Sequence, residues 1–419
     1  MSPHELTPDV ARQIVETLGA HGTPPEWGFQ FFTAGLEEYL QVIEDDYLKT
    51  YVAHGGASFK MVVGAYGGGK THFLYNVREL AWKHGYVVSY VSLRQDESPF
   101  HRMDRVYRAI ALNLMAPMTP EEILEGGEKG IGAFLKLWYE RALEQTAATA
   151  LDPGQQAAAL KEVARSGVAD LEGAHYASAV RHAFGALAED SVDDFEVILQ
   201  WLTADGYDHH LHREFGILRP LDRAIAFNSI RSLVQWVRNL GYRGLVILLD
   251  EAEQVPSMSS KQREIMLSNL RELIDECGQS AFRNVMVFYA VPGEQFLDGQ
   301  ANVYEALKQR VHSVFEFYNP SGVKIYLEKL GGDPLRLLEE IGGKLSTVFE
   351  RAFDVSFDPD KVEEAVRLAA VEAYEQRFGD IGYKRLFVQG LVRVFHYLRR
   401  KPDTAVDGAW VRSLFEGGA

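Results

Sequence analysis

Apolar residues follow two different patterns along this chain, one typical of strands and one typical of helices. Short, mostly apolar runs predict strands that are buried on both faces of a parallel sheet, and they cover residues 59–63, 86–93, 245–249 and 285–291. Helical spacing of the apolar residues predicts helices over 8–18, 72–84, 103–114 and 261–276. Strands that alternate with helices in this order predict a doubly wound α/β core.

Two long stretches show helical periodicity without a convincing strand. Residues 118–241 are rich in alanine and leucine, and the pattern from 321 to about 400 is also helical. A short apolar run over 311–317 reads as one more strand before the second stretch. We therefore expect an N-terminal helical segment, a core in two parts separated by a helical insertion, and a C-terminal helical domain, with boundaries at 1–55, 56–117, 118–241, 242–320 and 321–419.

A glycine-rich segment joins the first predicted strand to the helix after it. Residues 64–71 read Gly-Ala-Tyr-Gly-Gly-Gly-Lys-Thr, which matches the phosphate-binding loop (Walker A motif). In such a loop, glycines bring backbone N–H groups close to phosphate oxygens, and a helix begins directly at the anion. The residues expected to hold the nucleotide are Gly64, Gly67, Gly68, Gly69, Lys70, Thr71 and His72.

Two residues of this loop have distinct chemical roles. Lys70 would reach the β- and γ-phosphates of ATP as a point charge, and the hydroxyl of Thr71 would complete the coordination shell of Mg²⁺. The alternative interpretation is a glycine-rich turn followed by a surface lysine. The strand and helix that flank the loop favour the nucleotide site.

A pair of acids follows the third predicted strand. Asp250 and Glu251 come directly after the apolar run 245–249, as in a Walker B motif. Asp250 would hold Mg²⁺ through its waters, and Glu251 would orient and deprotonate the water that attacks the γ-phosphate. The alternative is a strand capped by two solvated acids. Two acids in tandem favour hydrolysis over transfer to another acceptor.

Composition restricts the partners and the location. The 419 residues are 47% hydrophobic, with no apolar stretch of eighteen or more residues and no signal-peptide pattern near Met1, so we expect no membrane span. The single cysteine, Cys277, cannot form an internal disulfide and fits a cytoplasmic protein.

The net charge makes nucleic-acid binding a local property. Fifty-nine acids against forty-three bases give a net charge of −16, which opposes non-specific adhesion to DNA. The best basic candidate is the predicted helix segment 393–401 with its arginines and lysine. A solvated helix face explains the same pattern.

The two motifs also carry a resemblance to a known family. The segments 60–74 and 241–253 resemble the ATP-binding proteins of BREX-type phage-defence loci (the BrxD-like family), over most of the chain. That family is similar to the Orc/Cdc6 branch of AAA+ ATPases. The resemblance implies an AAA+/ASCE-like P-loop NTPase with a C-terminal helical lid and an oligomeric site.

The resemblance implies roles for two arginines. Arg310 matches a position that projects towards the γ-phosphate of a neighbouring subunit, and Arg385 resembles a lid arginine that reads the γ-phosphate of its own subunit. The alternative for Arg310 is an arginine that opens a strand and pairs locally with Glu305 or Asp298. For Arg385 the alternatives are the adjacent Lys384 as the functional cation and a surface arginine. Relatives place a polar side chain at the end of the strand after Walker B, whereas this sequence has none in Tyr289–Gly293.

Two weaker patterns each have two interpretations. The aromatic residues at 27–32 could form the floor of an adenine pocket or pack in the core, and the histidines at 207–213 could bind a metal or lie in a solvated loop.

The function expected from these features is an ATPase that binds and hydrolyses ATP·Mg²⁺. The resemblance implies that nucleotide state drives assembly or remodelling of a DNA-processing complex in phage defence. Its partners would be copies of itself and a helicase or other DNA-processing protein of the same locus, with DNA bound indirectly or through the basic segment. A STAND-type signalling switch and a nucleotide-dependent scaffold with little turnover remain alternatives.

Overall fold

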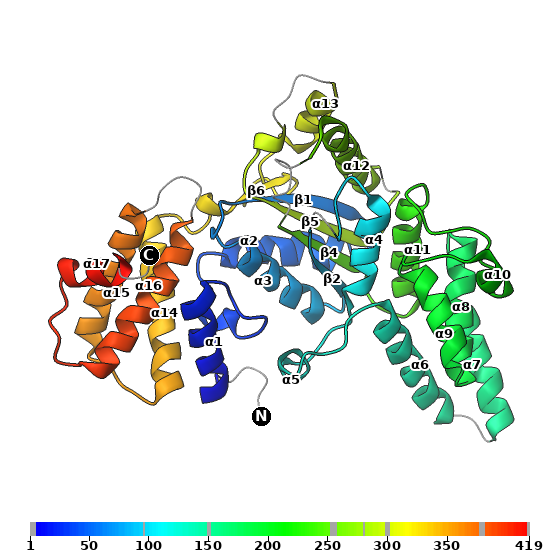
Figure 1. Cartoon of the computed structure of the whole chain (residues 1–419), viewed down its shortest axis with the longest axis horizontal. Coiled ribbons are helices and arrows are strands. Elements are labelled where there is room, and N and C mark those ends of the chain that lie inside the picture. Colours follow the sequence, from blue (N-terminus) through cyan, green and yellow to red (C-terminus); the bar gives the residue numbers. More distant parts are fainter. Residues whose placement is uncertain are drawn as a thin grey trace.

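The molecule has a central sheet with helices at both ends (Figure 1). The computed structural model describes residues 6–94, 97–148, 152–251, 258–279, 281–297, 302–376 and 382–416. The helical insertion lies on one side of the sheet, and the C-terminal helices lie on the other (Figure 1).

The sheet has six strands in the order β3-β2-β4-β5-β1-β6. Every neighbouring pair is parallel except β2 with β3, and the strands are β1 (Ala57–Val63), β2 (Val87–Ser92), β3 (Leu114–Met115), β4 (Leu245–Asp250), β5 (Val285–Val291) and β6 (Lys324–Tyr326). The four strands predicted over 59–63, 86–93, 245–249 and 285–291 are formed and pair in parallel. The prediction of a mostly parallel α/β sheet is therefore confirmed.

The central strands are buried on both faces, as the apolar runs predicted. In β4, Leu245 and Ile247 face one hydrophobic cluster, and Val246 and Leu248 face another. Helix α3 (Lys70–Lys83), α2 (Glu37–Val42) and the π-helical turn Ile43–Tyr51 contribute to the second cluster. Helices α4 (Met103–Leu112) and α12 (Ser260–Gly278) contribute to the first.

The expected strand over 311–317 is wrong. Helix α13 (Asn302–Val311) ends where this strand should begin, and the following residues make only isolated bridges, such as Val314 with Lys324. The sixth strand is β6, inside the stretch expected to be all helical. Its only fully buried residue is Ile325, and a single apolar position gives no detectable period.

All the secondary-structure elements in the described residues of the insertion are helices, and the insertion shares its core with the sheet. Trp138 packs against Phe184 and Trp236, and these side chains belong to the same cluster as the β4 side chains Leu245 and Ile247. Its helices are α5 (Pro120–Leu124), α6 (Ile131–Ala147), α7 (Pro153–Gly167), α8 (Ala174–Ala188), α9 (Val192–Leu202), α10 (His209–His212) and α11 (Ala226–Asn239).

The N-terminal helix packs with the C-terminal helices. Ile14 and Leu18 of α1 (Pro8–His21) lie in one cluster with Phe349 and Leu391, and α1 runs beside this bundle in Figure 1. The bundle consists otherwise of α14 (Pro334–Phe353), α15 (Pro359–Glu375), α16 (Tyr383–Arg400) and α17 (Gly408–Glu416). Helix α1, the first part of the expected N-terminal segment, thus completes the C-terminal helical bundle, whereas α2 and residues 43–51 pack on the sheet.

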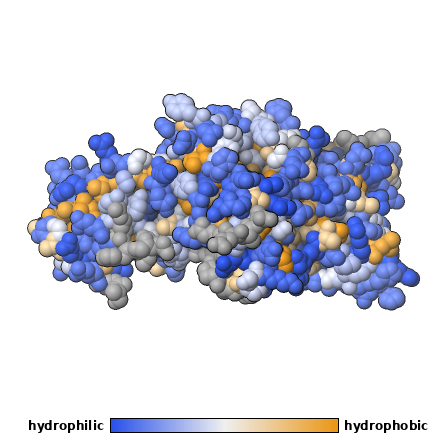
Figure 2. Space-filling model, turned by 90° about the horizontal axis from the view of Figure 1, so that it is seen from above, coloured by the Kyte–Doolittle hydropathy of each residue, from blue (hydrophilic) through white to orange (hydrophobic). Residues whose placement is uncertain are grey.

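The surface is mainly hydrophilic on the face shown in Figure 2, with a narrow hydrophobic strip on the side of the C-terminal helices. Among the described residues, no helix has both the length and the apolar character needed to cross a membrane.

Lys60 is the one charged residue in β1, and it is 1% exposed. Its Nζ donates to the hydroxyl of Tyr47 at 2.8 Å and to the carbonyls of Pro320 at 2.7 Å and Gly322 at 2.6 Å. It also lies 4.7 Å from the ring centre of Phe315. Through these hydrogen bonds, the side chain of Lys60 connects residues 320–322, just before β6, to the sheet.

We predict that Lys60→Met lowers the free energy of unfolding by about 1–3 kcal/mol, because buried acceptors lose their donor. Burial lowers the pKa of Lys60 to about 7, so between this pH and about 10.4 the unfolded chain binds more protons than the folded one. The loss should therefore grow as the pH rises from 7 to 9. Urea unfolding at several pH values measures it, and the exposed Lys261→Met is the control. Equal losses for both variants would contradict the prediction.

Candidate functional site

The glycine-rich loop connects β1 to α3 and requires glycine for two separate reasons. Gly67 and Gly69 have φ angles of 75° and 98°, a left-handed conformation that other residues rarely adopt. Gly64 and Gly68 do not have this left-handed conformation. They are restricted by space, because a Cβ at Gly68 would lie 2.9 Å from the carbonyl oxygen of Ala65, and one at Gly64 would lie 3.1 Å from Leu327. The expected backbone angles are confirmed at two glycines, and the other two are restricted by space.

Lys70 begins α3 and folds back over the loop. Its Nζ donates to the carbonyl oxygens of Gly64 at 2.9 Å and Ala65 at 3.2 Å, and the residue is 7% exposed. The alternative of a surface lysine therefore does not fit. The ammonium lies at the loop, where it can reach a phosphate bound to the loop amides.

Asp250 joins the loop to the sheet. Its Oδ2 accepts from the Thr71 hydroxyl at 2.8 Å and from the Tyr90 hydroxyl at 2.6 Å, and its Oδ1 accepts from the amide of Glu251 at 2.8 Å. Asp250 is 1% exposed. The predicted metal residues Thr71 and Asp250 are thus in direct contact, and both offer the hard oxygen donors that Mg²⁺ prefers.

Tyr90 was not identified from the sequence. Burial and the Asp250 carboxylate raise the pKa of Tyr90 well above its usual value, so its hydroxyl remains a donor. It lies on β2, beside the Walker B strand β4. The sequence did contain a signal for Tyr90, since it is a polar residue near the carboxyl end of a predicted strand. The carboxyl ends of parallel strands meet at the same edge of a sheet, where Asp250 also lies.

Glu251 follows β4 with a left-handed backbone, φ 57°. For a non-glycine residue this conformation costs about 1–3 kcal/mol and concentrates at functional sites. Ser92, whose backbone pairs with Asp250 at the end of β2, donates a hydrogen bond to Glu251 Oε2. The exposed carboxylate is therefore held beside the loop and Asp250. Residues 252–257, which include the end of the second resemblance segment, lie outside the described residues.

The C-terminal bundle closes over the loop and forms a pocket with it. The pocket has a volume of about 170 Å³. Polar residues of the loop and β4 form one wall, and the other is mainly apolar: Leu18, Phe32, Ala34, Leu36, Leu327, Leu337, Ile341 and Val388. This wall suits a flat apolar group attached to a polyphosphate.

Gly382 allows α16 to approach the loop. Its amide hydrogen bonds to the carbonyl of Tyr66 at 2.5 Å, and a Cβ on it would lie 2.5 Å from the amide nitrogen of Gly68. The next two residues that face the pocket are Lys384 and Arg385.

Two cations of α16 therefore lie at the phosphate loop. The guanidinium of Arg385 lies 4.6 Å from the ring centre of Tyr66, and its buried Nε has no hydrogen-bond partner among the described residues. Lys384 Nζ donates to the carbonyl of Leu327 at 3.4 Å, and burial lowers the pKa of Lys384 although Glu328 raises it. Both rivals lie at the pocket, so the choice between them stays open.

His72 supports the pocket from α3. Its Nε2 lies 2.8 Å from the Thr33 hydroxyl, and its ring packs against Phe29 and Phe32. Burial and the charge of Lys384 lower the pKa of His72 to about 3, so the ring is neutral at pH 7.

The aromatic residues at 27–32 lie in two different environments, at the pocket and in the core. Phe32 lines the pocket, whereas Phe29 and Trp27 are buried in hydrophobic clusters.

Arg310 lies outside the pocket. Its Nε and one terminal nitrogen both donate to Asp275, the latter at 2.9 Å, and the other terminal nitrogen donates to the carbonyl of Ala306 at 2.9 Å. It lies near the end of helix α13 and does not open a strand. Arg310 is thus in a local ion pair, but its partner is Asp275 and not Glu305; the other expected partner, Asp298, lies outside the described residues. A role at a neighbouring subunit stays a prediction.

No polar side chain ends β5, the strand between β1 and β4. Its last residue, Val291, accepts a hydrogen bond from the amide of Gly64 at 3.1 Å through its carbonyl. Within the described ranges, no group of three or more histidine, cysteine or acidic residues could hold a metal ion, which argues against a metal at the histidines of 207–213.

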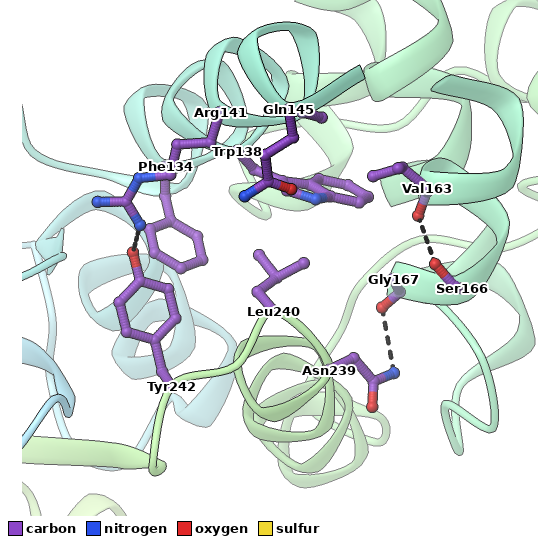
Figure 3. Close-up of a pocket in the computed structure, with 11 residues that line it drawn as sticks. Phe134, Trp138, Arg141, Gln145, Val163, Ser166, Gly167, Asn239, Leu240 and Tyr242 are labelled. Atoms are coloured by element: carbon purple, nitrogen blue, oxygen red, sulfur yellow. Dashed lines mark hydrogen bonds between the residues drawn. The ribbon is translucent and has the colours of Figure 1, made fainter. Parts of the chain in front are cut away.

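A second cavity lies between α6, α7 and α11 (Figure 3). Its volume is about 250 Å³. Arg141 at its edge donates to the hydroxyl of Tyr242, and Asn239 donates to the carbonyl of Gly167 at 3.1 Å (Figure 3). These groups are already hydrogen bonded, and the cavity holds neither the loop nor the acids.

One family matches nearly the whole chain. The model of the family "BREX system ATP-binding protein BrxC/D" matches residues 6–413, so the chain belongs to this family. No curated protein matches the chain. The family gives it a nucleotide-binding role, with ATP as the nucleotide, in a phage-defence system.

We predict that Gly382→Ala weakens ATP binding about tenfold, because its methyl group collides with the loop backbone and displaces the start of α16. Its φ of −68° suits alanine, so the effect is steric. The control is Gly343→Ala in α14, where a Cβ meets nothing within 4 Å. Titration with a fluorescent ATP analogue measures both variants. Unchanged affinity in Gly382→Ala would show that α16 does not contact the bound nucleotide.

Proposed function

We propose that this chain is a P-loop ATPase of the AAA+/ASCE type that hydrolyses ATP·Mg²⁺. The observation that carries the proposal is the hydrogen bond from Thr71 to Asp250 at 2.8 Å with Glu251 as the next residue. It joins the expected nucleotide loop to the expected catalytic acids. The position of β5 between β1 and β4 supports the ASCE type.

Binding uses the loop and the first turn of α3. The amides that follow Gly64 and the positive end of α3 surround one point, where the β- and γ-phosphates would lie. Lys70 turns from the loop carbonyls to the phosphate oxygens, and the apolar wall with Phe32 takes the base. Mg²⁺ held by Thr71 and Asp250 would neutralise charge on the phosphates.

Hydrolysis uses Glu251. Its carboxylate orients a water for attack on the γ-phosphorus and accepts the proton of that water. The hydrogen bond from Ser92 fixes its orientation, and a cation of α16 stabilises the charge on the γ-phosphate oxygens. Arg310 would act only in an oligomer and only after it leaves Asp275.

The work done by hydrolysis is proposed from the family. Nucleotide state would change the contact between the C-terminal helical domain and the loop, because only a ligand with different affinity for two states shifts their equilibrium. In the cytoplasm, this change would drive the assembly of copies of the chain with a helicase or other DNA-processing protein of the same locus.

A switch with little turnover is the second candidate. One observation favours it: β5 ends in Val291, without a polar side chain to position water. A steady-state rate well below one turnover per minute, with a stable ATP-bound assembly, would support the switch over the ATPase.

We predict that Glu251→Gln reduces hydrolysis at least about 100-fold, because it removes the general base, while ATP stays bound.

Lys70→Ala should abolish binding at micromolar ATP, because the ammonium that contacts the phosphates is lost. Phosphate release and equilibrium binding measure the two effects, and mass in solution with ATP tests for assembly in Glu251→Gln. Retained binding in Lys70→Ala would refute the nucleotide site.

The two cations of α16 can be separated by their alanine variants. A charged hydrogen bond contributes about 1.5–3 kcal/mol, so loss of the cation that contacts the γ-phosphate should weaken ATP binding about 10- to 100-fold and ADP binding little. Lys384→Ala and Arg385→Ala are compared by titration with both nucleotides. If neither variant distinguishes ATP from ADP, α16 does not read the γ-phosphate.

A further inference from the structure

A groove with strongly basic walls lies between α1 and α16, away from the phosphate loop. It has a volume of about 600 Å³ and is lined by Arg12 and Glu16 of α1 and by Arg393, Arg399, Arg400 and Lys401 from α16 and the residue after it. We call it the basic groove. It has five basic side chains against one carboxylate in a chain whose net charge is −16.

The sequence revealed only part of this feature. The segment 393–401 was indistinguishable from a solvated helix face, whereas packing of α1 against α16 adds Arg12 from the other end of the chain. The guanidiniums of Arg12 and Arg399 both lie over the ring of Phe353, at 4.2 Å and 4.0 Å from its centre. Two like charges on one ring create a fixed positive wall.

Most of this charge is not neutralised by the protein. Arg12 pairs with Glu16 at 2.7 Å, but both side chains are more than half exposed, and such pairs contribute little. Within the described part of the chain, Arg399, Arg400 and Lys401 form no ion pair. Burial and then the charge of Arg399 lower the pKa of His396 in the groove, as expected in a positive environment.

The chemistry of the groove suits a phosphate backbone. Guanidinium groups bind phosphate oxygens in a bidentate way, and four of the five cations are arginines. Tyr397 also lines the groove, with Lys401 Nζ 5.0 Å from its ring centre and Trp410 packed against it at 5.4 Å. Cations beside an aromatic ring are typical of nucleic-acid sites.

Both walls of the groove extend to the nucleotide pocket. Arg385 and Val388 line the pocket near the start of α16, and Arg399 lies on the same helix about 21 Å further along its axis. Leu18 lines the pocket on α1, less than two turns from Arg12. A Cβ on Gly22 would lie 2.7 Å from Arg385, so the two helices are in close contact at the pocket.

We propose that the basic groove binds the phosphate backbone of nucleic acid and that nucleotide in the pocket alters this affinity through α1 and α16. The second half rests on the proposed function, and the first half does not. Binding is local and electrostatic, so it falls steeply with salt. By linkage, nucleic acid changes the affinity for ATP by the same factor.

The test uses the full chain and fluorescent 30-residue oligonucleotides, single- and double-stranded. The variant Arg400→Glu/Lys401→Glu reverses two exposed charges and spares Arg399, which packs on Phe353. We expect at least a tenfold loss of affinity at 100 mM salt and a salt slope smaller by about two. The control Lys161→Glu/Arg181→Glu makes the same change of charge on exposed positions of the insertion and should bind as the wild type does.

Three results would overturn the groove as a nucleic-acid site. These are no oligonucleotide binding by the wild type, equal losses in the variant and the control, and tighter binding of polyglutamate than of either oligonucleotide. ATP binding and the melting temperature show that the variant is folded.

The coupling is tested separately in Glu251→Gln with and without ATP·Mg²⁺. A change of at least threefold in oligonucleotide affinity supports the coupling, and equal affinities refute it. If ATP does not bind at all while oligonucleotides bind at the groove, the proposed function fails and the groove remains.

Discussion

The proposed nucleotide pocket depends on one buried carboxylate. Asp250 is 1% exposed and accepts hydrogen bonds from Thr71, from Tyr90 and from the amide of Glu251. A buried charge without partners costs several kcal/mol, so these donors are what permit an ionised group at this depth. Through these hydrogen bonds to Asp250, the donors hold the glycine-rich loop against the carboxyl ends of β2 and β4. This is the geometry that the proposed hydrolysis of ATP requires.

The sequence predicted the parts of the fold that local patterns encode. Strands buried on both faces produce apolar runs, and a phosphate loop needs glycine at fixed positions, so β1, β2, β4 and β5 and residues 64–71 could be identified. β6 could not, because its three residues bury only Ile325 completely. The strand expected at 311–317 was wrong because Ser313 pairs its carbonyl with the Val323 and Lys324 amides outside a regular ladder.

The sequence also did not reveal residues whose partners are distant along the chain. Lys70, Thr71 and Asp250 were predicted because motifs name them, and the structure brings Thr71 and Asp250 together. Nothing in the sequence indicates that Ser92 bonds to Glu251 or that Asp275 holds Arg310. Each such partner depends on how two elements pack, and packing is set by many weak contacts at once.

The position of α1 has a consequence for the order of folding. Its apolar residues Ala11, Ile14 and Leu18 are buried in a cluster formed mainly by helices that begin at Pro334 or later. During synthesis most of their partners follow about 300 residues later, a delay of tens of seconds at ribosomal rates. The sheet can form in that interval. Docking of α1 is then a late step that closes the nucleotide pocket, and ATP present at that moment would favour the completed molecule over one with this helix still detached.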